Sequence, residues 1–321
     1  MRTRLTEMLG IEHPVMLAGM GGVSYHRLVA AVSDAGGIGT LGAATMQSDE
    51  MVAEMEQVRA LTDKPFGVDL LAAMPDRMVE DAKRIVKGGA SLFVAGLGVP
   101  RDVIKILHDG NALVASMCGK VRHAIAAVEA GCDFVIAQGT EAGGHTGTVA
   151  TMPLVPQIVD AVEGCVPVVA AGGIFDGRGL AAALSLGADG VWLGTRFIAT
   201  PEARTVPGYK DALLRTMEDG TVISRGFTGK TLRAVRNEWT QYIEEHPEEL
   251  RPFPEQMGRA VAAKALHLGG DENADVDEDK ECYPAGQGVG AIHQLEAAGD
   301  IVRRIVAEAE VALGRAAGSL S

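Results

Sequence analysis

Eight short apolar segments, separated by longer stretches with helical periodicity, restrict the fold of this 321-residue chain more than any other feature. Continuous apolar runs are typical of parallel strands buried on both faces, and parallel strands need helical crossovers between them. The predicted strands are Val15–Leu17, Ile38–Leu41, Phe66–Leu70, Leu92–Ala95, Leu113–Ser116, Phe134–Ala137, Val168–Ala171 and Val191–Leu193. The predicted helices between them include Tyr25–Ala35, Asp49–Leu61, Pro75–Lys87, Val121–Ala130, Pro153–Val162 and Gly177–Leu186.

Eight regular strand–helix units favour an α/β fold of the (β/α)₈ TIM-barrel type. An open doubly wound sheet is the alternative, but no feature marks a point where the strand order reverses. We expect residues 1–205 to form the barrel. Residues 206–285 are more polar and rich in Pro, Arg and Glu, and they are expected to form a mostly helical insertion or lid. Residues 286–321 are expected to return with a helix that packs on the barrel.

Composition excludes several classes of protein. The formal net charge of -13 argues against a nucleic-acid backbone or an anionic membrane surface as the main partner. No apolar run approaches the length of a membrane span, and the start MRTRLTEMLG lacks the apolar region of a secretory signal. Four scattered cysteines without a C-x-x-C pair fit a reducing compartment, so a cytoplasmic location is expected. A homo-oligomer is compatible with these observations.

Glycine turns follow the last two predicted strands. Gly172-Gly173 ends the seventh strand and Gly194-Thr195 ends the eighth. Barrels of this kind hold phosphate in these two turns, and glycine lets backbone amides approach an oxyanion closely. A helix beginning near Asp176 would add a favourable dipole. The sequence therefore predicts a phosphate site, although tight connecting turns would look similar.

The loop after the sixth strand, from Gln138 to Gly147, contains four glycines and His145. Histidine is the side chain best suited to proton transfer near neutral pH, so His145 is the candidate catalytic residue. Gly37–Gly42 fits the G-x-G-x-x-G pattern but follows a helix and contains a predicted strand, which argues against a dinucleotide site. Neither a paired His/carboxylate spacing nor an HExxH motif is present, so no metal site is expected.

Six sequence motifs resemble the nitronate monooxygenase family, formerly called 2-nitropropane dioxygenases. They are HPVMLAGMGGVS, KPFGVDLL, AQGTEAGGHTG, MPLVPQIVDAV, PVVAAGGIFDGRGLAAALSLGADGVWLGTRFIAT and PAGQGVGAI, and they cover almost the whole barrel. The same motifs occur in flavin-dependent enoyl-acyl-carrier-protein reductases, NADH:quinone reductases and CoA-thioester oxidoreductases. The resemblance implies a barrel that binds FMN.

The resemblance also implies roles for individual residues. The FMN phosphate would lie on Gly172, Gly173, Gly194 and Thr195. The flavin ring would face Ala18, Gly19 and Met20, with Gln138, Gly143 and Gly144 close to it. His145 matches the family's catalytic histidine. Asp69 stands where the family more often has Asn, and a carboxylate there would alter hydrogen bonding and charge near the flavin.

The implied reaction is oxidation of nitronates or nitroalkanes with O₂ to a carbonyl compound and nitrite. The alternatives are an NAD(P)H-dependent reductase of quinones, enoyl-acyl carriers or CoA thioesters, and a barrel that binds FMN without turnover. Four basic residues of the insertion either bind a nucleotide or CoA phosphate or form a solvated helix face. They are Arg225, Lys230, Arg233 and Arg236.

Overall fold

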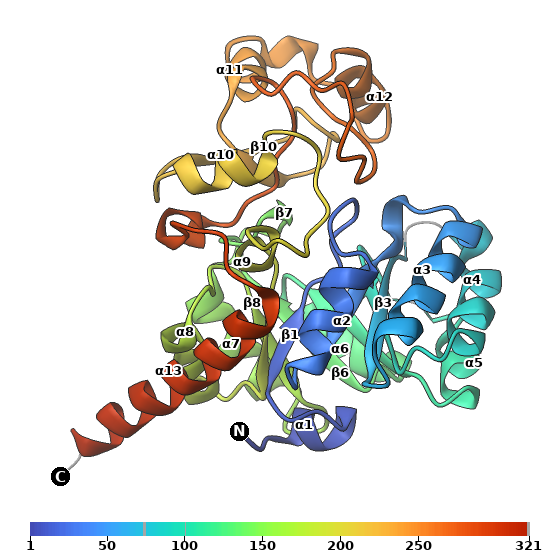
Figure 1. The fold of residues 1–321 in the computed structure, drawn as a ribbon, viewed down its shortest axis with the longest axis vertical. Helices are drawn as coiled ribbons and strands as arrows, with labels where there is room; N and C mark the ends of the chain where they lie inside the picture. Colours follow the sequence, from blue (N-terminus) through green and yellow to red (C-terminus); the bar gives the residue numbers. More distant parts are fainter. Residues whose placement is uncertain (73–74, 100, 320–321) are drawn as a thin grey trace.

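The computed structural model describes residues 1–72, 75–99 and 101–319 and contains a nearly closed barrel of eight parallel strands (Figure 1). The neighbours in the sheet follow the order β1-β9-β8-β6-β5-β4-β3-β2, and a bridge between Met16 and Ile38 joins its two ends. The predicted TIM barrel is therefore confirmed. The strands are β1 (Val15–Leu17), β2 (Gly39–Gly42), β3 (Phe66–Leu71), β4 (Leu92–Gly96), β5 (Leu113–Cys118), β6 (Phe134–Gln138), β8 (Val168–Ala171) and β9 (Gly190–Leu193).

The barrel strands are apolar throughout because both of their faces are buried. In β6, Phe134 and Ile136 pack inside the barrel, whereas Val135 and Ala137 pack under the surrounding helices. Leu5 and Leu9 of the short helix α1 (Arg4–Leu9) join the interior cluster. The G-x-G-x-x-G segment forms β2, as predicted, and is not a nucleotide loop.

Helices cover the outside of the barrel after each strand. The six predicted helices begin and end within two residues of their predicted bounds, and two short helices, α5 and α9, were not among the predicted ones. The helices are α2 (His26–Asp34), α3 (Ser48–Leu61), α4 (Pro75–Lys87), α5 (Ile104–Asp109), α6 (Val121–Ala130), α7 (Thr151–Ala161), α8 (Gly177–Ser185) and α9 (Thr195–Ile198). Among the described residues, no helix combines the length and the apolar composition that crossing a membrane requires.

The segment 206–285 is less helical than predicted. It contains α10 (Tyr209–Arg215), α11 (Glu238–Glu245) and α12 (Glu255–Ala262), but also strands β10 (Thr221–Ser224) and β11 (Leu232–Val235) and long irregular stretches. Its apolar core includes Phe227, Trp239 and Ile243 and is separate from the barrel clusters. In Figure 1 this segment lies above the barrel.

Helix α13 (Ala298–Gly318) returns to the barrel and packs against both α8 and α2. It therefore occupies the position of the eighth barrel helix. Gly177 begins α8 at this contact, where an added Cβ would lie 2.3 Å from Cβ of Glu308. The close approach of the two helices depends on this missing side chain.

We expect Gly177→Ala to lower the free energy of unfolding by roughly 1–3 kcal/mol, because the new methyl group has to push α13 away from α8. Gly314→Ala is the matched control, since its Cβ would meet nothing within 4 Å. It should raise stability by up to about 1 kcal/mol through helix propensity. Urea unfolding followed by circular dichroism measures both. Similar stabilities for the two variants would contradict this packing.

Candidate functional site

The carboxyl ends of the barrel strands surround a cavity of about 1350 Å³ that extends under the 206–285 segment. Enzymes with this fold hold their active sites at this end of the barrel. Every residue predicted for the site lines this one cavity. The residues are Ala18, Gly19, Met20, Asp69, Gln138, Gly143, Gly144, His145, Gly172, Gly173, Gly194 and Thr195.

The turn after β8 has a backbone that favours glycine. Gly172 has φ 102° and Gly173 has φ 72°, both in the left-handed region. A Cβ on Gly172 would also lie 2.9 Å from the carbonyl oxygen of Gly139. Within the described residues, no acceptor receives the backbone N–H groups of Gly173, Gly194 or Thr195. These amides are available to an anion in the cavity.

Helix α8 begins at Gly177, next to the predicted Asp176, but its first backbone N–H groups already have acceptors and are not free for a phosphate. The Asp176 carboxylate accepts the backbone N–H groups of Arg178 and Gly179, and Glu308 accepts that of Gly177 at 2.9 Å. Asp is among the preferred N-cap residues, so this capping was readable from the sequence. Thr195 is also partly engaged, because its Oγ1 accepts the Gly286 N–H at 2.9 Å.

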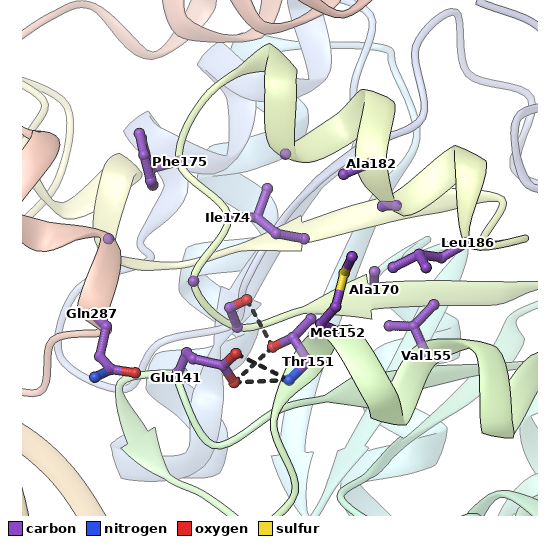
Figure 2. A pocket seen from close by; sticks show the side chains of 15 residues that line it. Glu141, Thr151, Met152, Val155, Ala170, Ile174, Phe175, Ala182, Leu186 and Gln287 are labelled. Atoms are coloured by element: carbon purple, nitrogen blue, oxygen red, sulfur yellow. Dashed lines mark hydrogen bonds between the residues drawn. The ribbon is translucent and has the colours of Figure 1, made fainter. Parts of the chain in front are cut away.

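A second cavity of about 300 Å³ lies on the other side of the Gly172–Gly173 turn and is mostly apolar (Figure 2). Figure 2 shows Glu141 and Thr151 facing each other there, and the Glu141 carboxylate accepts the Thr151 N–H at 2.9 Å. The Thr151 hydroxyl lies 2.9 Å from both Glu141 Oε2 and the Gly172 carbonyl oxygen. These contacts hold the glycine turn against the loop that carries His145.

A small antiparallel sheet positions His145. Strand β7 (Gly144–His145) pairs with β11 of the insertion, with His145 opposite Leu232, and β11 pairs with β10. Gln138 Nε2 donates to the His145 carbonyl oxygen at 2.7 Å. Gln138, predicted near the flavin, therefore also fixes the backbone of the histidine.

The His145 ring contacts Thr228, a residue that the sequence analysis did not single out. Nε2 lies 2.9 Å from Thr228 Oγ1, which also accepts the Lys230 N–H at 3.3 Å and lies 3.4 Å from the Lys230 carbonyl oxygen. All three contacts are satisfied when Nε2 carries the ring hydrogen and the hydroxyl donates to the carbonyl. Nδ1, without a partner among the described residues, then presents its lone pair.

Burial disfavours the charged forms of His145 and Asp69, the two titratable residues among the predicted site residues. Burial, with a smaller effect of the Lys230 ammonium, lowers the pKa of His145 to about 4, so the imidazole is neutral at physiological pH. Burial raises the pKa of the Asp69 carboxyl well above its usual range. A protonated Asp69 offers one donor and one acceptor, as Asn would, which reduces the difference from the family pattern.

The four basic residues of the insertion divide into two groups. Arg225 and Lys230 line the cavity. Arg233 is buried elsewhere and donates to the Thr140 carbonyl and the Thr221 hydroxyl, while Arg236 is exposed and pairs with Glu244 at 3.0 Å. One expected alternative was that these residues form a solvated helix face. That alternative is wrong for Arg233, which belongs to strand β11.

The fold and this cavity define a (β/α)₈-barrel protein with its site at the carboxyl ends of the strands. The model of the nitronate monooxygenase family matches residues 2–95 and 79–308. A Mycobacterium tuberculosis protein named (3aS,4S,5R,7aS)-5-hydroxy-7a-methyl-1-oxo-octahydro-1H-indene-4-carboxyl-CoA dehydrogenase is 43% identical over 245 residues, which cover 76% of this chain and 69% of that protein.

Two solved structures are similar over nearly their full lengths. FabK from Thermotoga maritima has a TM-score of 0.88 and 32% identity, covering 99% of both chains. Nitroalkane oxidase from Streptomyces ansochromogenes has a TM-score of 0.82 and 31% identity, covering 96% of this chain and 99% of that one. The chain belongs to the nitronate monooxygenase family and is an oxidoreductase.

We expect the His145 imidazole to titrate near pH 4 and Lys230→Met to raise its pKa. Removing the ammonium lowers the cost of protonating the ring, while burial, the larger cause, keeps the pKa below the ordinary 6.5. NMR titration of the histidine signals measures the change. Arg236→Gln is the control and should leave the pKa of His145 unchanged. A pKa in Lys230→Met equal to or below that of the unmodified protein would contradict this electrostatic coupling.

Proposed function

We propose that the cavity binds FMN, with the phosphate on the turns after β8 and β9 and the flavin ring over the barrel mouth. Three observations support this assignment. Over the part of the chain that the structure describes, the backbone N–H groups of Gly173, Gly194 and Thr195 have no acceptor. The motifs around them resemble those of FMN-binding relatives. The cavity, at about 1350 Å³, exceeds the ~300–1,000 Å³ of most small-molecule pockets and has room for a cofactor and a substrate together.

We propose that the protein oxidises substrates whose reacting carbon is acidic, with His145 as the base. Bound FMN would supply the electron acceptor. His145 Nδ1 takes the proton from the carbon beside the electron-withdrawing group, and Thr228 holds the ring in the tautomer that leaves Nδ1 free. The observation that carries this proposal is the geometry of the ring, which lines the cavity and uses Nε2 for Thr228, so that Nδ1 has no partner among the described residues.

Nitronates and nitroalkanes, oxidised with O₂, are the first proposed substrates. A nitro group acidifies the neighbouring C–H, which suits a base with a low pKa. The family match and the likeness to a structure named nitroalkane oxidase support this class. A preformed nitronate would need no proton removal.

CoA thioesters are the second candidate, and two observations favour them. The cavity is far larger than a nitroalkane beside a flavin requires. The Mycobacterium tuberculosis relative is named for action on a CoA thioester. The C–H beside a thioester carbonyl is also acidic, so His145 would have the same task in either reaction.

An anaerobic comparison distinguishes these substrates from the reductase alternative. The FMN-loaded protein is mixed in turn with a nitronate, an acyl-CoA, NADH and NADPH, and flavin bleaching is followed by stopped flow. Rapid bleaching by the nitronate supports the first proposal, and bleaching by the acyl-CoA supports the second. Saturable bleaching by NADH or NADPH alone would favour a reductase, and no bleaching at all would favour a barrel without turnover.

We expect the purified protein to release FMN, and no FAD, on denaturation. Gly173→Asp should yield mostly apoprotein, because it places a carboxylate and a strained backbone at the phosphate position. Chromatography of the released flavin and the ratio of flavin to protein absorbance measure both effects. Gly258→Asp, at a helix position with nothing within 4 Å of its Cβ, is the control. Full flavin content in Gly173→Asp would place the phosphate elsewhere.

We expect His145→Ala to retain FMN and to lose roughly 10²–10⁴-fold in turnover of the neutral nitroalkane, the usual contribution of a positioned base. Turnover of the preformed nitronate should fall much less, because its proton is already gone. Steady-state kcat with each form measures the difference. Equal losses with the two forms would assign His145 to binding or to tuning of the flavin.

A further inference from the structure

Lys230 is a half-buried cation at the mouth of the cavity that has no carboxylate partner. Its Nζ lies 4.2 Å from the centroid of the Phe253 ring, and no described acidic side chain forms an ion pair with it. An unpaired ammonium in such a place is available to an anionic ligand.

The backbone connects Lys230 directly to the proposed base. Lys230 precedes β11, which pairs with β7, the strand that contains His145. Its backbone N–H and carbonyl oxygen both lie against Thr228 Oγ1, which contacts the His145 ring at 2.9 Å. The ammonium is also close enough to lower the pKa of that ring. Lys230 and His145 therefore line the same cavity and are connected through Thr228.

The cavity is electropositive although the chain is acidic. Its only described carboxyl-bearing residues are Asp69 and Glu281, and burial raises the pKa of both. Lys120 and Arg225 line the same cavity, and neither forms an ion pair with a described residue. A site with this imbalance attracts anions and stabilises negative charge that develops inside it.

We propose that Lys230 is the oxyanion-binding residue of the site and that it holds the substrate oxygen on which negative charge appears. The inference rests on the proposed function and names the electrostatic partner of His145. When the C–H bond breaks, its proton goes to His145 Nδ1 and its electron pair delocalises to the nitro or carbonyl oxygen. One anion then lies between two cations, the imidazolium and the Lys230 ammonium.

This arrangement gives a lysine beside a base a favourable role as well as an unfavourable one. In the free protein Lys230 makes His145 harder to protonate, which weakens the base. With an anionic oxygen between them, the repulsion between the two cations is offset by two attractions. The Phe253 ring supports the ammonium without neutralising it, because a cation–π contact leaves the positive charge intact.

The test uses isobutyrate, an unreactive oxyanion with the shape of the nitronate of 2-nitropropane, and isobutyramide as its neutral counterpart. Calorimetry on the FMN-loaded protein measures their Kd values in unmodified protein, Lys230→Met, Lys230→Arg and the exposed control Arg236→Gln. We expect Lys230→Met to weaken isobutyrate binding by on the order of 10–100-fold, the usual worth of a hydrogen bond to a charged group. Lys230→Arg should lose much less, and isobutyramide should bind all four proteins similarly.

Unchanged isobutyrate affinity in Lys230→Met would overturn the proposal. So would an equal loss for isobutyramide, because it would show that the substitution damages the cavity rather than removing a charge. These outcomes are separable from failure of the proposed function, since binding requires neither turnover nor His145 as base. A protein that binds isobutyrate through Lys230 but never reduces its flavin would retain the anion site and lose the proposed reaction.

Discussion

The site depends on the pairing of the two-residue strand β7 with β11. Through it, the loop after β6 is fixed by a segment from a distant part of the chain. Barrel residues also hold this loop, because Gln138 donates to the His145 carbonyl oxygen and Glu141 contacts Thr151, but the pairing with β11 brings in the segment that carries Thr228. With it, the ring meets Thr228, and the backbone carbonyl of His145 accepts from Gln138. The catalytic end of the barrel is thus completed by residues that do not belong to the barrel.

The barrel could be predicted because its strands are buried on both faces and leave continuous apolar runs. The glycine turns could be predicted because they follow strands directly. Strands β10 and β11 could not, since they lie in a polar segment outside the strand–helix alternation, and the two central residues of β10 are only partly buried or exposed. Thr228 could not be predicted as a site residue either, because its role comes only from a contact with His145, more than eighty positions earlier in the chain. Sequence also treats Lys230 and Arg233 alike, although one lines the cavity and the other supports its wall.

The charged and titratable groups of the site together favour a negatively charged ligand. Burial lowers the pKa of His145 and raises the pKa of Asp69 and of Glu281, the two carboxyl-bearing residues among the described lining of the cavity. The opposing positive groups lie on the insertion and at the start of α6. A pocket arranged in this way gains most from a ligand that brings or develops a negative charge, since water no longer has to be reorganised when that charge appears.

The placement of the eighth helix after the insertion affects how the molecule is made on the ribosome. All eight barrel strands have been synthesised once Leu193 is added, yet the surfaces of α2 and α8 that α13 covers still lack their partner. The insertion is produced during this interval and has its own apolar core. Only when residues 298–318 leave the exit tunnel can the outer ring close. Residues 298–318 therefore control when the nascent barrel stops presenting the surface between α2 and α8 to chaperones and to other nascent chains.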